Sequence, residues 1–191
     1  MFLEIMEQLR KQKTLSHNDV RYFINESIQG SLTIAKQAAI LTGLLLKGYN
    51  PKEIATFVRV FSQYAEKKIT FEGAIDICGT GGSGLPRINT STINAFLLSS
   101  LGIPIAKHGN KAASGRVGSF DLLESLGIHY DHSKEKTEGL AKTFHLNFLF
   151  ARNFHPAMRH FTAVRKELGM STIFNLLGPL LNPAETERQM I

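Results

Sequence analysis

The first 67 residues repeat apolar positions with the three- to four-residue period of amphipathic helices. Ser16 and Asp19 have the spacing of a capping box, and Asn50 followed by Pro51 has the residue types that open a helix. Apolar stripes of this kind are typical of helices that pack on one another. We therefore expect residues 1–70 to form a small helical domain.

From about Ala74 the pattern changes to short apolar runs that alternate with helical stretches. Short runs bounded by glycine or proline are typical of buried strands. We expect strands at Ala74–Cys78, Ile103–Ala106 and Asn147–Phe150, and helices at Thr90–Leu101, Phe120–Leu126, Lys134–Phe144 and Pro156 to about Leu168. Because alternating strands and helices predict a parallel sheet, we expect residues 71–191 to form an α/β domain.

A parallel sheet would gather three segments at one edge, because binding loops follow the carboxyl ends of its strands. These segments are the glycine turn that begins at Gly79, Lys107–Asn110, and Arg152–His155. The glycine turn has the most residues suited to ligand binding, since an apolar run leads into it and the hydroxyl-rich residues Asn89–Thr92 follow it. Glycines and a helix start both present backbone N–H groups, which suit a bound anion.

The charges around the turn agree with an anionic ligand. No Asp or Glu occurs between Asp76 and Asp121, whereas the same window contains Arg87, Lys107 and two further basic residues. A polyphosphate requires such a basic, acid-free surrounding. A surface loop without a function would usually carry some acids in a chain with 20% charged residues.

Two common phosphate-binding motifs do not fit this turn. Gly79, Gly81 and Gly84 match the dinucleotide fingerprint, but the acid expected about 20 residues further on is absent. A P-loop requires Gly-Lys-Ser/Thr at the end of its spacing, and Gly84 is followed by Leu85.

Composition limits the remaining classes. The chain has 191 residues, 43% of them hydrophobic, which suits one globular domain or one with a small companion. A net charge of +6 is compatible with small anionic substrates, and no basic or aromatic patch predicts nucleic-acid binding. The single cysteine, Cys78, excludes an internal disulfide and is expected to be a buried apolar residue. No secretory signal and no membrane-spanning run is present, so we expect a cytoplasmic protein.

The stretch from Asp76 onward resembles the anthranilate phosphoribosyltransferase family. Its hallmarks are a Gly-Thr-Gly-Gly turn, Asn-x-Ser-Thr and Lys-His-Gly-Asn, which stand here at residues 79–82, 89–92 and 107–110. The resemblance continues through Ser114–Ser119, Asp121–Glu124, Phe150–Met158 and Asn175–Pro183. Several separate motifs in the same order make the resemblance specific, although no single motif would.

The resemblance implies a fold, a reaction and partners. The fold is a small amino-terminal helical domain plus a partial parallel-sheet α/β domain, of the nucleoside phosphorylase/phosphoribosyltransferase class III kind. The reaction transfers the phosphoribosyl group of phosphoribosyl pyrophosphate (PRPP) to anthranilate, giving N-(5-phosphoribosyl)anthranilate and pyrophosphate, in tryptophan biosynthesis. The family uses Mg²⁺, and the helical segment would pair with its copy in a homodimer.

The resemblance also implies site residues. The residues that would bind PRPP are Gly79, Gly82, Ser83, Arg87, Asn89, Thr90, Ser91, Thr92, Lys107 and Ser119, with Ser91 also touching the metal. Gly79, Asn110 and Arg165 would bind anthranilate, with His108 as a further candidate. We assign no catalytic residue, because such a reaction depends mainly on positioning and charge stabilisation.

Three departures from the family pattern leave alternatives open. Ser83 stands where family members usually have Asp, and Arg87 stands where they usually have Thr. The family pattern continues well beyond Ile191 and includes an Asp-Glu pair that holds magnesium. Two other hypotheses are therefore a pyrimidine nucleoside phosphorylase-like enzyme and a truncated fragment that binds PRPP without turnover.

Overall fold

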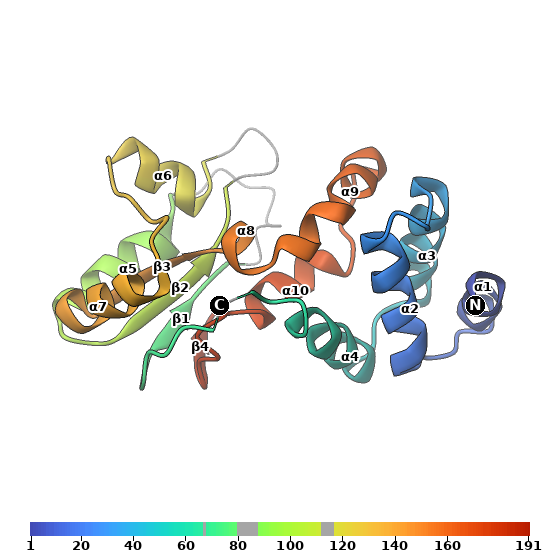
Figure 1. The fold of residues 1–191 in the computed structure, drawn as a ribbon, viewed down its shortest axis with the longest axis horizontal. Helices are drawn as coiled ribbons and strands as arrows, with labels where there is room; N and C mark the ends of the chain where they lie inside the picture. Colours follow the sequence, from blue (N-terminus) through green and yellow to red (C-terminus); the bar gives the residue numbers. More distant parts are fainter. Residues whose placement is uncertain (67, 80–87, 112–116) are drawn as a thin grey trace. The chain divides into compact units, whose positions relative to one another are not determined.

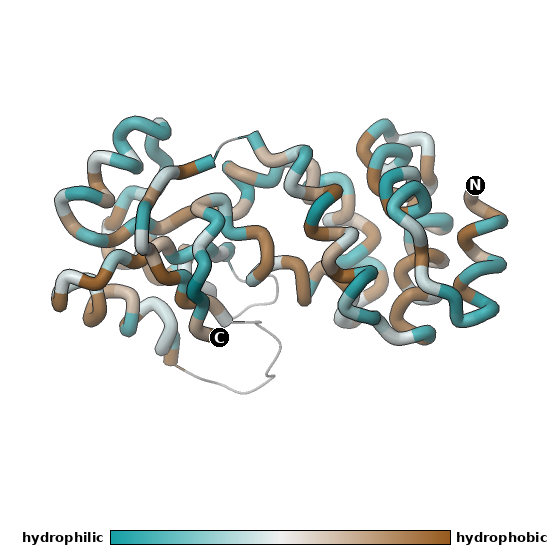
Figure 2. The backbone as a smooth tube through the Cα atoms, turned by 90° about the horizontal axis from the view of Figure 1, so that it is seen from below, coloured by the Kyte–Doolittle hydropathy of each residue, from teal (hydrophilic) through white to brown (hydrophobic). Residues whose placement is uncertain are grey.

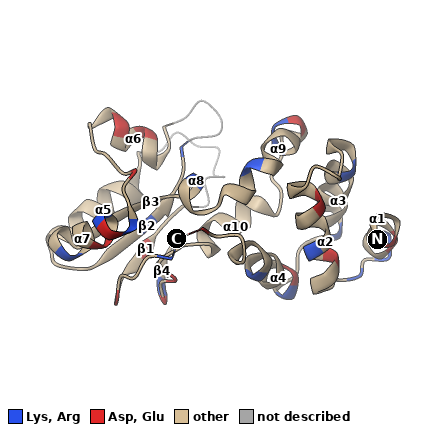
Figure 3. Ribbon diagram, viewed as in Figure 1, with Lys and Arg blue, Asp and Glu red and all other residues tan. Residues whose placement is uncertain are grey.

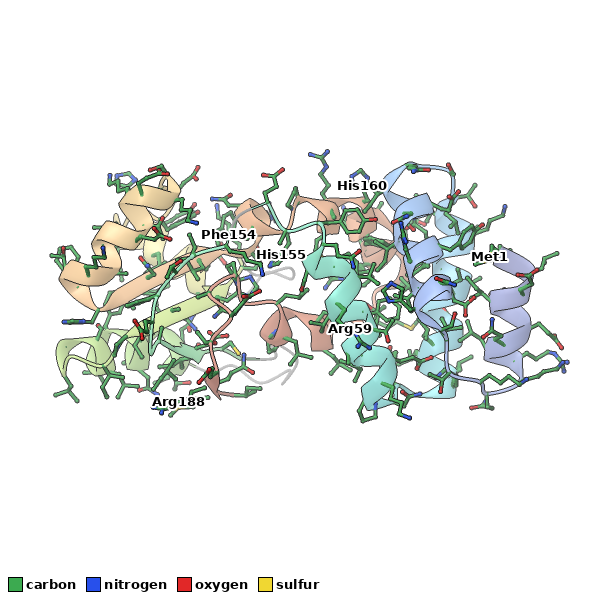
Figure 4. The ribbon with its side chains drawn as sticks, turned by 60° about the horizontal axis from the view of Figure 1, so that its bottom comes forward. Met1, Arg59, Phe154, His155, His160 and Arg188 are labelled. Carbon is green, nitrogen blue, oxygen red and sulfur yellow. The ribbon has the colours of Figure 1, made fainter. Side chains whose placement is uncertain are left out.

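A computed structural model describes residues 1–66, 68–79, 88–111 and 117–191 of the chain (Figure 1). Contacts between Cα atoms divide it into two compact units. A helical unit contains Met1–Tyr64 and His155–Leu180, and an α/β unit contains Ala65–Phe154 and Leu181–Ile191. The chain changes unit after Tyr64, after Phe154 and after Leu180, and Figure 4 labels Phe154 and His155 at the second of these boundaries.

Four helices form the amino-terminal part of the helical unit: α1 (Phe2–Arg10), α2 (His17–Ile28), α3 (Ile34–Lys47) and α4 (Pro51–Ser62). The expected capping box begins α2, where Ser16 N donates to Asp19 Oδ2 over 2.9 Å and Asp19 N donates to Ser16 Oγ over 3.3 Å. Asn50 Oδ1 caps α4 by accepting from Glu53 N over 2.9 Å. Figure 2 shows hydrophobic and hydrophilic residues alternating along these helices.

A later segment completes the helical unit. It contains the 3₁₀-helix η1 (Pro156–Phe161), α9 (Thr162–Leu168) and α10 (Phe174–Leu180). The buried Phe161 ring lies 5.5 Å from Phe23, 5.7 Å from Phe61 and 4.7 Å from Phe174, measured between ring centroids. The two compact units therefore differ from the contiguous domains 1–70 and 71–191 expected from the sequence, because residues 155–180 belong to the helical unit. Long-range aromatic packing, which local periodicity does not reveal, joins residues 155–180 to the amino-terminal helices.

One buried ion pair lies inside the helical unit. Lys47 Nζ contacts Glu53 Oε2 at 2.6 Å, and Glu53 Oε1 also accepts a hydrogen bond from Leu15 N over 2.8 Å. The Glu53 side chain is fully buried and that of Lys47 is 5% exposed. The carboxylate therefore links α3, α4 and the segment between α1 and α2.

In its described residues, the α/β unit contains a four-stranded parallel sheet with the order β3-β2-β1-β4. Its strands are β1 (Ile75–Ile77), β2 (Ile105–Gly109), β3 (Leu146–Phe150) and β4 (Arg188–Met190). The first three confirm the expected strands, but β2 extends to Gly109, so Lys107 and His108 lie within a strand and do not follow one. The sequence pattern around Arg188–Met190 does not predict β4.

The helices of this unit are α5 (Thr90–Ser100), α6 (Ser119–Ser125), α7 (Lys134–Phe144) and the short α8 (Ala151–Phe154). Ala95 of α5 packs with Ile77 and Ile105 in one apolar cluster, and Ala106 and Leu149 belong to a second one. Strand residues alternate between faces, so the two clusters cover opposite faces of the sheet. Acidic and basic residues are spread over both units (Figure 3). No helix in the described ranges is long and apolar enough to cross a bilayer.

Candidate active site

Helix α5 begins with a dense set of hydrogen bonds. Asn89 Oδ1 accepts from Thr92 Oγ1 over 2.8 Å, from Thr92 N over 3.3 Å and from Ser91 Oγ over 3.3 Å. Thr92 is fully buried, whereas Thr90 is exposed. The Asn89 side chain therefore caps the first turn of α5. The start of a helix carries a partial positive charge, which favours an anion at this position.

Lys107 joins this helix start to the sheet. Its side chain is only 1% exposed, and its Nζ donates to Ile77 O over 2.6 Å and to Ser91 Oγ over 2.8 Å. Burial lowers the pKa of Lys107 from 10.5 to about 8, although the nearby Asp76 carboxylate acts in the opposite direction. Lys107 is thus a fixed, mainly protonated cation at neutral pH. An ammonium has three donors, and the described residues accept from two of them.

Asp76 is a fully buried carboxylate that sequence reasoning did not select. Its Oδ1 accepts from His108 N over 3.2 Å, and its Oδ2 accepts from Gln189 Nε2 over 2.9 Å. The neighbouring Cys78 is buried, as expected, and burial together with the Asp76 charge raises the pKa of its thiol to about 12. The sequence did contain a signal for Asp76, namely an acid inside an apolar strand. Because acids are rarely buried without a partner, such a position indicates a specific interaction.

The other predicted PRPP-binding residues are placed only in part. Gly79 lies two residues after the end of β1 and is exposed, with no atom within 4 Å of the position a Cβ would occupy. Ser119 opens α6, and its Cβ lies 3.7 Å from the Cβ position of Gly109 at the end of β2. Because β1 and β2 are parallel neighbours, Gly79 and Gly109 both lie at the carboxyl edge of the sheet. Gly82, Ser83 and Arg87 lie outside the described residues.

The predicted anthranilate-binding residues belong to both units. Asn110 is exposed just after β2, where its Oδ1 accepts from Lys111 N over 2.9 Å. His108 is 5% exposed, and strand alternation places its side chain on the opposite face of the sheet from that of Lys107.

Arg165 is part of α9 in the helical unit. Its guanidinium carbon lies 5.4 Å from the centroid of the Phe174 ring. Burial lowers its pKa. No acid among the described residues forms an ion pair with it. The side chain therefore has the capacity to bind a carboxylate.

A cavity of about 250 Å³ lies elsewhere in the α/β unit, beside β3. Residues of both charge signs line it, among them Glu66, His132 and Arg152. Its lining contains none of the described residues that are predicted to bind a substrate. We therefore place the candidate site at the exposed carboxyl edge of β1 and β2 and not in this cavity.

The described residues offer limited metal-binding capacity. No group of three or more His, Cys, Asp or Glu side chains in them could hold a metal ion. Ser91 Oγ already accepts from the Lys107 ammonium, so it has one lone pair for a further interaction. The described residues therefore offer a magnesium ion one hydroxyl oxygen, that of Ser91, and its other ligands would have to come from a bound anion or from water.

Sequence comparison matches both parts of the chain. The family described as "Glycosyl transferase family, helical bundle domain" matches residues 3–65, and the family described as "Glycosyl transferase family, a/b domain" matches residues 72–191. An anthranilate phosphoribosyltransferase from Deinococcus radiodurans is 43% identical over 182 residues. That match covers 94% of this chain and 54% of the relative, so the chain spans about half the length of the relatives it matches.

Solved structures show the same relationship. Anthranilate phosphoribosyltransferase from Thermus thermophilus is 38% identical with a TM-score of 0.87, over 97% of this chain and 57% of that one. The Saccharomyces cerevisiae protein in complex with PRPP and Mg is 30% identical with a TM-score of 0.84, over 95% of this chain and 55% of that one. The helical unit and the parallel-sheet unit are therefore those of known structures.

Proposed function

Because the chain belongs to the glycosyl transferase family with a helical-bundle and an α/β domain, we propose that it transfers a phosphoribosyl group from PRPP to anthranilate. The observation that carries this proposal is the buried Lys107, whose ammonium bonds Ser91 at the start of α5. A fixed cation beside a helix start suits the pyrophosphate of PRPP. The relatives named above support the same reaction, since they are anthranilate phosphoribosyltransferases.

Each residue predicted to bind PRPP has a role in this proposal. The N–H of Gly79 and the first turn of α5 bind pyrophosphate oxygens, and Lys107 stabilises the charge that grows on them as the bond to ribose breaks. Gly82, Ser83, Arg87 and Ser119 are the further proposed PRPP contacts. The anthranilate amine forms the new bond to the ribose carbon and loses a proton. When bound, Mg²⁺ supplies additional positive charge to the pyrophosphate, with Ser91 Oγ as its proposed protein ligand.

Anthranilate is a flat aromatic carboxylate, and Arg165 is its proposed partner. A guanidinium donates two parallel hydrogen bonds to a carboxylate, and Arg165 has no ion-pair partner among the described residues. Asn110 is the proposed polar partner from the α/β unit. The remaining parts of the proposal are a homodimer formed through the helical unit and a place in tryptophan biosynthesis.

A second candidate is a PRPP-binding unit that needs further polypeptide for turnover. One observation favours it: no group of three or more His, Cys, Asp or Glu side chains among the described residues could hold a metal ion. In this case Lys107 and the start of α5 would bind PRPP, and catalysis would require the remaining part of the family's length.

One assay separates the two candidates. The 191-residue chain is mixed with anthranilate, PRPP and Mg²⁺, and the loss of anthranilate fluorescence is followed. Turnover supports the transferase. PRPP binding in calorimetry without turnover supports the binding unit, particularly if the missing half of a relative restores activity when added. Absence of PRPP binding contradicts both candidates, and nucleoside cleavage that depends on phosphate would indicate a phosphorylase.

The assigned role of Arg165 is tested with a matched neighbour. In whichever preparation turns over, Arg165→Ala is expected to raise the KM for anthranilate about tenfold or more, the size of a lost charge-assisted hydrogen bond. The adjacent exposed Lys166→Ala is expected to leave KM unchanged. Equal effects of the two variants would mean that this helix contributes only general positive charge.

A further inference from the structure

Strands β1 and β2 separate after a single residue pair. They pair only at Ile75 and Ile105, whereas β2 and β3 pair at five consecutive positions. In a continued parallel ladder, His108 N–H would donate to the carbonyl of Ile77. Here His108 N donates to Asp76 Oδ1, and the Ile77 carbonyl accepts from Lys107 Nζ. Side chains have therefore replaced main-chain pairing at the carboxyl ends of these strands.

Two side chains take up main-chain groups of β2 that a continued ladder would pair with β1. Asp76 is fully buried, and its two carboxylate oxygens reach His108 N of β2 and Gln189 Nε2 of β4. Asn182 donates from Nδ2 to the carbonyl of Ala106 over 2.8 Å, while its Oδ1 accepts from Ala184 N over 2.9 Å. Asp76 therefore links β1 to β2 and β4, and Asn182 links β2 to the segment that follows α10.

We infer that Asp76 and Asn182 are positioning residues, which hold the carboxyl ends of β1 and β2 apart so that the Lys107 ammonium reaches Ser91. The inference rests on the proposed function, because Lys107 and Ser91 are its proposed phosphate-binding groups. If the two strands closed, His108 N–H would take the Ile77 carbonyl. That carbonyl is one of the two acceptors that fix Lys107. The ammonium would then lose the position that suits the ligand.

The decisive variant is Asp76→Asn. An amide has a single acceptor oxygen, so it satisfies His108 N or Gln189 Nε2 but not both. We expect the affinity for inorganic pyrophosphate, measured by calorimetry on the full chain, to fall about tenfold, the size of one lost hydrogen bond to a charged group. Asn182→Ala is expected to act in the same direction.

Rescue distinguishes positioning from simple damage to the fold. Gln189→Glu combined with Asp76→Asn restores an acceptor opposite the new amide, and we expect most of the lost pyrophosphate affinity to return. Asn147→Ala is the matched control, because Asn147 is a buried amide on neighbouring β3, 4% exposed. Its melting temperature is expected to fall while its pyrophosphate affinity stays within about twofold. The inference is overturned if the double variant binds no better than Asp76→Asn, or if Asn147→Ala weakens binding equally.

A ligand-free measurement keeps the inference separate from the proposed function. NMR detects couplings across hydrogen bonds, and His108 N is expected to couple to the side-chain carboxyl carbon of Asp76. Coupling to the Ile77 carbonyl carbon would show a closed ladder and overturn the inference. A different outcome is that the unaltered chain binds neither pyrophosphate nor PRPP while the coupling between His108 and Asp76 is present. In that case the proposed function fails, and the separation of β1 from β2 by Asp76 still holds.

Discussion

At the scale of single residues, Lys107 combines a charge with near-complete burial. A lysine is rarely buried unless its ammonium is hydrogen-bonded, and here Ile77 O and Ser91 Oγ provide that bonding. A buried, bonded cation has few conformations left to lose when a ligand binds. This arrangement favours a role in binding over one in general solubility.

Replacing Lys107 by methionine tests this role. We expect Lys107→Met to weaken pyrophosphate binding by about tenfold to a hundredfold, because a charge-assisted contact is lost from a buried site. Lys111→Met is the control, since Lys111 is half-buried and pairs with Glu124 at 2.6 Å. Calorimetry with both variants provides the measurement. Equal losses would assign the binding to net charge alone.

Cys78 provides a second residue-scale prediction. The raised pKa of about 12 leaves roughly a thousandfold less thiolate at pH 8 than the usual value of 9, so alkylation by iodoacetamide should be slower by about that factor in the folded chain than in urea. The sign for stability follows: the contribution of the protonated thiol is complete below pH 9 and is lost as the pH rises toward 12. Rapid alkylation of the folded chain would contradict the buried position of Cys78.

At the scale of elements, helix starts carry both stability and proposed function. Asn89 caps α5 and Ser133 caps α7 in the same way, with each side chain accepting from the backbone N–H three residues later. Of these two starts, only that of α5 is in contact with Lys107, whose ammonium bonds Ser91. The two caps therefore form a natural pair for comparison.

Alanine at each cap separates the two contributions. Asn89→Ala and Ser133→Ala should each lower the free energy of unfolding by about 1 kcal/mol, the usual value of an N-cap. Pyrophosphate affinity should fall only for Asn89→Ala, because Asn89 orders the Ser91 hydroxyl that bonds Lys107. Denaturant titration and calorimetry measure the two effects. A loss of affinity in Ser133→Ala would show that the effect is general.

The ion pair between α3 and α4 predicts a large effect on stability. Glu53→Ala leaves the Lys47 ammonium buried without its partner, which should cost about 3–5 kcal/mol of unfolding free energy. Glu185→Ala is the control, because its pair with Lys68 is largely exposed and should contribute about 0–1 kcal/mol. Similar midpoints of denaturant unfolding for the two variants would contradict the structure of the helical unit.

At the scale of the whole molecule, the helical unit is built from two distant segments. Phe161, from the later segment, is fully buried against Phe23 and Phe61 of the earlier one. Phe161→Ala should therefore lower the free energy of unfolding by about 3–5 kcal/mol. Phe144→Ala, at a ring 61% exposed, should change it by less than about 0.5 kcal/mol. Equal values, measured by thermal or denaturant unfolding, would mean that the two segments do not share a core.

The sequence by itself determined the features that depend on neighbouring residues. The capped starts at Ser16 and Asn50 were predictable, because a capping side chain bonds an N–H only three residues away. The sequence also predicted the alternation of strands and helices and showed the motifs around Gly79, since these features lie within short stretches of the chain.

Only the tertiary structure decided the features that depend on distant residues. The burial of Lys107, the separation of β1 from β2 and the role of Asp76 involve groups about 30 to 110 residues apart, such as His108 and Gln189. The pairing of β4 with β1 and the packing of Phe161 are equally long-range. Such contacts form only when folding has brought the segments together, and no local pattern encodes which segment each buried polar group will meet.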